Sequence, residues 1–139
     1  MSLDRFVTAQ DAVHTAMLAE LRAGRKRTHW MWFVFPQLAG LGTSPTARFY
    51  ALADAAEARA FLAHPVLAQR LFEATATMLA APGRAEAILG EIDAVKLRSS
   101  MTLFAAVADD PTPFAAVLAR FYGGASDPAT LRLLGYSGH

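Results

Sequence analysis

Glycine and proline residues interrupt this chain at intervals that match the length of single helices. The stretches between them are rich in alanine, the best helix former, and few show the alternating β-branched residues that are typical of strands. Helices are predicted over residues 4–23, 44–52, 54–63, 64–81, 93–108, 111–122 and 126–135, with a brief helix ending near residue 89. Residues 25–36 are predicted to be either a short helix or an irregular segment. The sequence therefore predicts an all-α fold, a compact single-domain orthogonal bundle of about seven or eight short helices covering residues 1–139.

Length and composition exclude several classes of protein. The 139 residues have the usual size of one domain, and 54% of them are hydrophobic while 18% are charged, which is the opposite of an intrinsically disordered chain. No cysteine is present, which excludes disulfides, thiolate metal sites and cysteine nucleophiles. The first residues lack a secretion signal, and the apolar run at residues 30–35 is too short to span a bilayer. We therefore expect a cytoplasmic protein that does not enter a membrane.

Positive charge is concentrated in one stretch of an otherwise balanced chain. The net charge is only +1, which argues against nucleic acid as a partner. The stretch between Glu20 and Asp54 contains no carboxylate, and it carries Arg22, Arg25, Lys26, Arg27 and Arg48, together with His29, Trp30, Trp32, Phe33 and Phe35. Cations beside an exposed ring would suit a nucleotide, with the charge on its phosphate and the ring against its base. Trp30 is predicted to be partly exposed; the alternative is that the aromatic residues form core and the cations a solvated turn.

Polar residues fall on the apolar face of the helix predicted over residues 93–108. At about 100° per residue, the stripe of Leu97, Met101, Phe104 and Val107 also receives Asp93, Lys96 and Ser100. A lysine on such a face must extend to solvent, pair with a carboxylate, or meet an anion in a cavity. Two interpretations stay open: a structural Asp93–Lys96 pair near the helix start, or two groups that line a ligand pocket.

Weaker signals lie in the first predicted helix and in a glycine-containing loop. Gln10 and His14 project close to Phe6 and Met17, where an amide usually bridges buried backbone groups and a histidine usually belongs to the core. The loop at residues 40–45 ends at a predicted helix start, which is a generic anion site. The four histidines show no metal-ligand spacing and no known catalytic motif occurs, so we expect no metal and no cofactor.

Four segments carry a family resemblance. They are Arg5-Phe6-Val7-x-Ala9-Gln10, the run GRKxxHWMWFVFPQ from Gly24 to Gln37, His64-Pro65-x-Leu67, and the run DxxKLxSSMTLF from Asp93 to Phe104. These segments resemble the bacterial family called domain of unknown function 1810, and the resemblance covers nearly the whole chain. It implies an all-helical single domain of unassigned activity. Members of that family are often labelled calpastatin, but calpastatin is a disordered, charged chain, and the composition here is its opposite.

A second, fainter similarity covers only part of the chain. Its residues are Phe61, His64, Leu67, Leu71, Thr75 and Leu79, followed by Gly90 and Lys96. In this order they are similar to the central helices of the NADAR superfamily, which implies a link to NAD and ADP-ribose metabolism. No catalytic role is carried over to this chain by that similarity.

These observations give a leading hypothesis for function and one alternative. The leading hypothesis is a pocket that binds or processes a small anionic ligand, such as a nucleotide or an ADP-ribose-like molecule. Its ligand-binding candidates are Gln10, Arg25, Lys26, His29, Trp30 and Ser100. If the protein is an enzyme, Asp93 is the candidate general base and Lys96 the electrostatic stabiliser. The alternative is a protein-interaction module without catalysis, whose flat surface around Arg25 and Trp30 docks an acidic partner.

Overall fold

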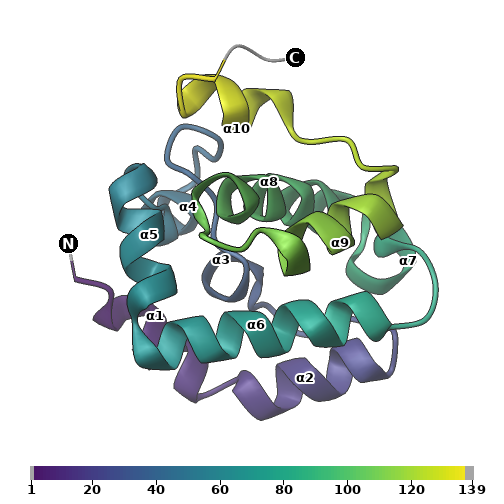
Figure 1. The fold of residues 1–139 in the computed structure, drawn as a ribbon. Helices are drawn as coiled ribbons and strands as arrows, with labels where there is room; N and C mark the ends of the chain where they lie inside the picture. The colour runs from purple at the N-terminus through teal and green to yellow at the C-terminus, as the bar shows by residue number, and fades with distance from the viewer. Residues whose placement is uncertain (1, 137–139) are drawn as a thin grey trace.

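The structure of the chain is a computed structural model that describes residues 2–136, which form ten helices (Figure 1). In chain order the helices are α1 (Asp4–Asp11), α2 (His14–Arg22), α3 (Met31–Val34), α4 (Pro45–Tyr50), α5 (Ala55–Ala63), α6 (Pro65–Ala80), α7 (Ala85–Leu89), α8 (Glu91–Val107), α9 (Thr112–Tyr122) and α10 (Pro128–Leu133). The predicted all-α, single-domain bundle is confirmed, with ten helices in place of the seven or eight expected. Within residues 2–136, no helix combines the length and the apolar character that crossing a membrane requires.

Several helices begin where the sequence places a capping residue. Ser44 Oγ, Asp54 Oδ1 and Asp127 Oδ2 each accept a hydrogen bond from the amide three residues further on, at 3.1, 2.9 and 3.1 Å. Each oxygen satisfies a backbone amide that has no partner inside the first turn of its helix. His64, at the start of the helix predicted over residues 64–81, caps α6 through Nδ1, which accepts hydrogen bonds from the Val66 and Leu67 amides (3.2 and 3.3 Å). The local sequence therefore sets the starts of α4, α5, α6 and α10.

The long helix predicted over residues 4–23 is divided into α1 and α2 by a turn at residues 12–13. The residues on both sides of the turn contact α6. Arg70 Nη2 lies 2.7 Å from Asp11 Oδ1, and His14 Nε2 lies 2.6 Å from Glu73 Oε1. These contacts hold α1 and α2 separately against α6, and the local sequence pattern does not contain them. Tertiary contacts thus override helix propensity at this point.

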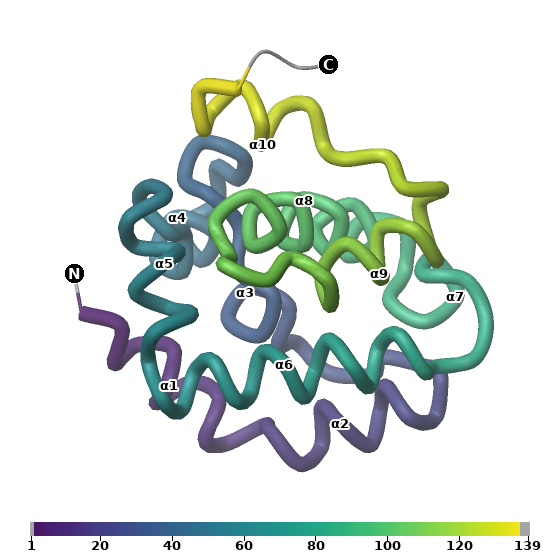
Figure 2. The backbone as a smooth tube through the Cα atoms, in the orientation of Figure 1, coloured from purple at the N-terminus to yellow at the C-terminus, as the bar shows by residue number. Residues whose placement is uncertain are grey.

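Helices α2 and α6 lie side by side and form one side of the molecule, at the lower edge of Figure 1. Helix α8 packs against α9, α7, α5 and α10, and α3 occupies the middle of the view. The tube in Figure 2 shows the chain running from α2 into the middle of the molecule at α3 and then out to α4. This path buries most of the apolar run around α3: Trp30, Met31, Phe33, Val34 and Phe35.

Four aromatic rings form a continuous line through the core. Phe6 meets Phe61 edge to face with ring centroids 5.2 Å apart, Phe61 lies 5.5 Å from Phe104, and Phe104 lies 5.6 Å from Phe114. All four side chains are fully buried. Because they come from α1, α5, α8 and α9, this line of rings ties helices that are distant in the sequence into one core.

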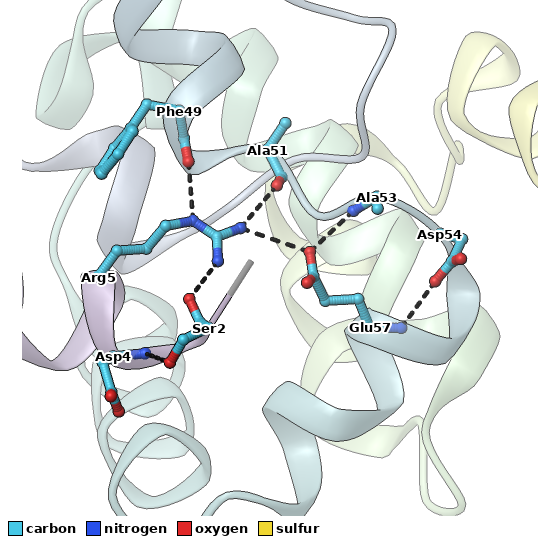
Figure 3. Close-up of polar contacts among 8 residues, drawn as sticks. All are labelled: Ser2, Asp4, Arg5, Phe49, Ala51, Ala53, Asp54 and Glu57. Atoms are coloured by element: carbon cyan, nitrogen blue, oxygen red, sulfur yellow. Dashed lines mark hydrogen bonds and ion pairs between the residues drawn. The ribbon is translucent and has the colours of Figure 1, made fainter.

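Arg5 fastens α1 to the segment that follows α4 (Figure 3). Its guanidinium donates to the carbonyl oxygens of Phe49 (Nε, 2.8 Å) and Ala51 (Nη2, 3.0 Å), and Nη2 lies 3.4 Å from Glu57 Oε1. Glu57 Oε1 also accepts a hydrogen bond from the Ala53 amide (2.9 Å). The Arg5 side chain is only 6% exposed, so solvent competes little for these bonds. The cluster holds α4 in place, and α4 forms one wall of the candidate site described below.

The loop at residues 36–43 packs closely on α4 and on the segment after it. Gln37 O accepts a hydrogen bond from the Leu52 amide (2.9 Å), next to an isolated bridge between Leu38 and Leu52. A Cβ atom on Gly42 would lie 2.6 Å from the Cβ of Ala47, closer than two such atoms can approach. Glycine at position 42 therefore permits the contact between the loop and α4.

Candidate functional site

Glu20, the last acid before the basic stretch, is a buried carboxylate that orders the segment between α2 and α3. We call this segment, residues 23–30, the basic turn. Its carboxylate accepts hydrogen bonds from the Arg27 amide (2.7 Å), the Thr28 hydroxyl (2.7 Å) and amide (3.1 Å), and the Trp30 indole N–H (2.9 Å). Burial by itself raises the pKa of this carboxyl, but these bonds together outweigh burial and lower the pKa from 4.5 to about 2. The basic turn is therefore folded around a fixed negative charge.

Trp30 is fully buried, so the prediction that its ring is partly exposed is wrong. Its indole N–H is bound to Glu20, and its ring packs 6.3 Å from the ring of Phe35 in the core. A buried ring offers no face to a ligand. Trp30 also cannot form part of the flat docking surface around Arg25 and Trp30 that the alternative hypothesis requires. Phe35 is also fully buried, so at these two rings the alternative that the aromatic residues form core holds.

Asp93 lies between two lysines and forms an ion pair with each. Its Oδ2 lies 3.0 Å from Lys26 Nζ, and its Oδ1 lies 3.3 Å from Lys96 Nζ. The Lys26 amide donates to the carbonyl of Ile88 (2.7 Å), which fixes the basic turn beside the start of α8. The side chains of Lys26, Asp93 and Lys96 are 10, 17 and 21% exposed, so the three charges are partly withdrawn from water. Two ammonium groups share one carboxylate, which leaves the triad with a net charge of +1.

Both lysines of this triad also lie over tryptophan rings. Lys26 Nζ is 5.1 Å from the ring of Trp30, and Lys96 Nζ is 4.5 Å from the ring of Trp32. Such cation–π contacts hold an ammonium in place without neutralising its charge. Trp32 differs from Trp30 in being half-buried, so its ring reaches the surface beside Lys96.

A groove of about 520 Å³ opens at Trp32 and Lys96, between α8 and the segment from α3 to α4. Its apolar lining consists of Trp32, Leu41, Gly42, Ala47, Ile92 and Val95. Its polar lining consists of Gln37, Thr43, Ser44 and Lys96. We call it the Trp32–Lys96 groove. It combines an aromatic ring, one ammonium group and neutral hydrogen-bonding side chains around an apolar floor, which is a typical composition of small-molecule sites.

Comparison with known proteins places the chain in a family. A family model described as a protein of unknown function, DUF1810, matches residues 1–134. The chain belongs to the DUF1810 family. The fold is similar to the crystal structure of the conserved hypothetical protein Rv1873 from Mycobacterium tuberculosis, with 50% sequence identity, a TM-score of 0.94 and 97% of each chain covered. A comparison with curated proteins gives no match.

The resemblance to this family seen in the sequence is thus confirmed, while the similarity to the NADAR superfamily stays a prediction. The DUF1810 match extends over nearly the whole chain and includes the residues of the triad and of the groove. The family description gives no activity, so the arrangement of side chains carries the functional argument.

The fold brings some of the predicted site residues of this DUF1810 protein together and separates others. Lys26, Asp93 and Lys96 meet in the triad, and Lys96 alone of the predicted residues lines the groove. Gln10 is buried and donates to the carbonyl of Phe33 (2.7 Å), which is the structural use of an amide considered from the sequence.

The remaining predicted residues lie outside the groove lining. Arg25 and His29 are exposed on the basic turn. Ser100 is fully buried, and its hydroxyl has no hydrogen-bond partner among residues 2–136. The pocket is therefore formed by fewer of the predicted residues than expected, because helix periodicity places a residue on a face without showing what covers that face.

Nine of the ten residues that line the groove were not among the predicted site residues, and they include Trp32, Gln37, Ile92 and Val95. The sequence carried a signal for Ile92 and Val95, since both are apolar residues off the apolar stripe of Leu97, Met101 and Phe104. The side chains of Ile92 and Val95 are 75 and 63% exposed, which is unusual for residues of this type. Trp32 also carried a signal, because it lies in the basic and aromatic stretch between Glu20 and Asp54, but Gln37 carried none. The positions of both residues at the groove depend on the path of the chain around α3.

Proposed function

We propose that this protein binds a small anionic ligand, such as a nucleotide or a similar molecule, in the Trp32–Lys96 groove. The observation that carries the proposal is the ammonium group of Lys96, which stands at the groove over the ring of Trp32 and shares its carboxylate partner with Lys26. The volume of about 520 Å³ lies within the range of roughly 300–1,000 Å³ that is usual for small-molecule sites.

The charge of the triad supports an anion as the ligand. If Lys96 turns toward a ligand, Asp93 still has Lys26 as its partner at 3.0 Å, so its partly buried carboxylate is not left unpaired. Lys96 can therefore bind an anion at a small cost to the protein. Because its side chain is only 21% exposed, its attraction for an anion is screened less than that of a surface lysine.

The apolar lining supports a ligand with an apolar or aromatic part. Ile92 and Val95 expose most of their side chains on α8, beside the half-buried ring of Trp32. A ring placed against these residues would remove apolar surface from water, at about 25 cal/mol per Å². An anionic group and a ring on one molecule would satisfy both halves of the groove.

For a bound substrate, the same geometry suggests distinct roles for the two candidate catalytic residues. Lys96 would stabilise negative charge that develops on the ligand. Both carboxylate oxygens of Asp93 already face ammonium groups, so the geometry favours Asp93 as the residue that positions Lys96 over its use as a general base.

Thermal unfolding with and without AMP, cyclic AMP and ADP-ribose tests the proposal. A ligand present at about 100 times its Kd stabilises the folded protein by about 2.7 kcal/mol, which raises Tm by several degrees. We expect at least one of these compounds to raise the Tm of the wild type, and Lys96→Gln to abolish the increase. Arg84→Gln, which removes an 87% exposed cation elsewhere, is the control and should respond like the wild type. No increase with any compound, or an equal increase in Lys96→Gln, would contradict the proposal.

A further inference from the structure

We infer, on the basis of the proposed function, that the Trp32–Lys96 groove selects a flat organic monoanion over a ligand with a pyrophosphate. The inference concerns the charge and the shape of the ligand. It follows from how few charges line the groove and from how its two walls are built.

The lining of the groove supplies one positive charge. Among the described residues that line it, Lys96 is the one that carries a formal charge. Lys26 contributes to the net charge of the triad, but its side chain is 10% exposed, is paired with Asp93 and lies outside the lining. Arg25, although exposed, lies outside it as well. A ligand in the groove therefore meets a single ammonium group.

One ammonium group matches one negative charge better than two. The attraction of a ligand to Lys96 grows in proportion to the charge of the ligand, whereas the cost of removing that charge from water grows with its square. A second negative charge in the groove would have no cation opposite it, and an unpaired charge withdrawn from water is costly. Gln37, Thr43 and Ser44 can hydrogen-bond an anionic group but cannot neutralise it.

The two walls of the groove favour a flat body for the ligand. One wall is the face of α8 that carries Ile92, Val95 and Lys96. The opposite wall includes Gly42 and Ala47, where the loop approaches α4 so closely that position 42 has no room for a side chain. Gly42 and Ala47 carry no bulky side chain on one wall, and Ile92 and Val95 present branched apolar side chains on the other, so a flat ring beside Trp32 would lie against apolar surface on both sides.

Calorimetric titration of the wild type with a series of matched probes tests this inference. Adenosine, cyclic AMP, AMP and ADP-ribose share the same adenine group and differ in their phosphates. Adenosine is neutral, cyclic AMP carries one negative charge, and AMP and ADP-ribose carry up to two. Indole-3-acetate carries one carboxylate on a flat ring and separates the effect of a single charge from that of a phosphodiester. We expect cyclic AMP or indole-3-acetate to bind at least about tenfold tighter than adenosine and ADP-ribose, a difference of about 1.4 kcal/mol.

A gain-of-function variant gives a second, independent readout. Ile92 lies one helical turn before Lys96 on the same face of α8, and its side chain is 75% exposed, so its replacement should not disturb the core. Ile92→Lys supplies a second ammonium group and should shift the preference toward AMP and ADP-ribose. Ile92→Gln is the matched control, because it removes the apolar side chain without adding charge, and it should keep the preference for a single charge.

The outcomes separate this inference from the proposed function. Tighter binding of AMP or ADP-ribose than of both monoanions to the wild type would overturn the inference and leave the proposed function standing. Binding of adenosine as tightly as of both monoanions would overturn both, as would no binding of any probe. An unchanged preference in Ile92→Lys would also overturn the inference, because the number of cations in the groove would then not determine the charge of the ligand.

Discussion

Glu20 shows at the scale of single residues how one side chain can organise the surroundings of a site. Its carboxylate binds the backbone and side-chain donors of the basic turn and holds the indole of Trp30 in the core. The basic turn ordered in this way places Lys26 beside Asp93. None of these bonds was evident in the sequence, where Glu20 merely marked the edge of an acid-free stretch. Ten residues separate Glu20 from Trp30, and local spacing carries no information about a contact that the path of the chain creates.

The lowered pKa of Glu20 predicts a pH dependence of stability. The pKa of the carboxyl is about 2 in the folded protein and 4.5 in its ordinary state, so its ionised form is favoured by folding. The stabilisation is fully present above pH 4.5 and is lost as the pH falls from 4.5 toward 2. After allowance for solvent screening, we expect about 2 kcal/mol of the free energy of unfolding to depend on this carboxylate.

Urea unfolding of the wild type and Glu20→Gln at several pH values between 3 and 7 measures this contribution. The variant should be less stable by about 2 kcal/mol or more at pH 7, because its amide directs a donor at other donors, and the difference should narrow toward pH 3. Glu91→Gln makes the same chemical change at an exposed residue and should keep the pH dependence of the wild type. A constant difference between wild type and Glu20→Gln across this pH range would show that ionisation of Glu20 is not linked to folding.

At the scale of secondary-structure elements, most of the helices could be predicted from local signals. Caps at Ser44, Asp54 and Asp127 and the breakers between helices are read directly from the sequence, because they act within one turn. The division between α1 and α2 could not be predicted, since it accompanies contacts of Arg70 and Glu73 that come from α6. Four-residue α3 is held in the middle of the molecule by burial of its aromatic neighbours, and its limits carry no cap.

In the candidate site, too, the features set within one helix could be predicted and those set by tertiary contacts could not. The periodicity of α8 placed Asp93 and Lys96 on one face, and the structure pairs them, but the second lysine of the triad comes from a turn far away in the sequence. The wall opposite α8 is formed by the loop at residues 36–43 and by α4. The sequence indicated only residues 40–45 as a generic anion site, because the approach of this wall to α8 is set by the whole fold.

The close contact between this loop and α4 makes a prediction about Gly42. Gly42→Ala places a Cβ atom 2.6 Å from the Cβ of Ala47 and should displace α4, at a cost of about 1–3 kcal/mol in the free energy of unfolding. Ala47→Gly removes the opposing atom, so the double variant Gly42→Ala/Ala47→Gly should recover part of the stability lost, which a double-mutant cycle from thermal or urea unfolding would measure. Strict additivity of the two single changes would contradict the proposed clash.

At the scale of the whole molecule, the line of rings from Phe6 to Phe114 determines whether the ten helices act as one unit. The rings join α1, α5, α8 and α9, and α8 also carries Asp93 and Lys96. The groove is therefore supported by an element anchored in the centre of the core. A rigid wall of this kind keeps Lys96 in position over Trp32 without the help of a ligand.

Phe61 stands in the middle of this line and provides the test of a single core. Phe61→Ala removes contacts with both Phe6 and Phe104 and should lower the free energy of unfolding by about 3–5 kcal/mol. Phe49→Ala, at a residue 47% exposed, is the control and should cost about 1 kcal/mol or less. If the core is one unit, Phe61→Ala will unfold in a single transition, with tryptophan fluorescence near α3 and far-ultraviolet circular dichroism of all helices giving the same midpoint. Separate midpoints would mean that the helices around Trp30 and Trp32 form a stable unit without the ring of Phe61, and the groove would then owe its shape to local contacts alone.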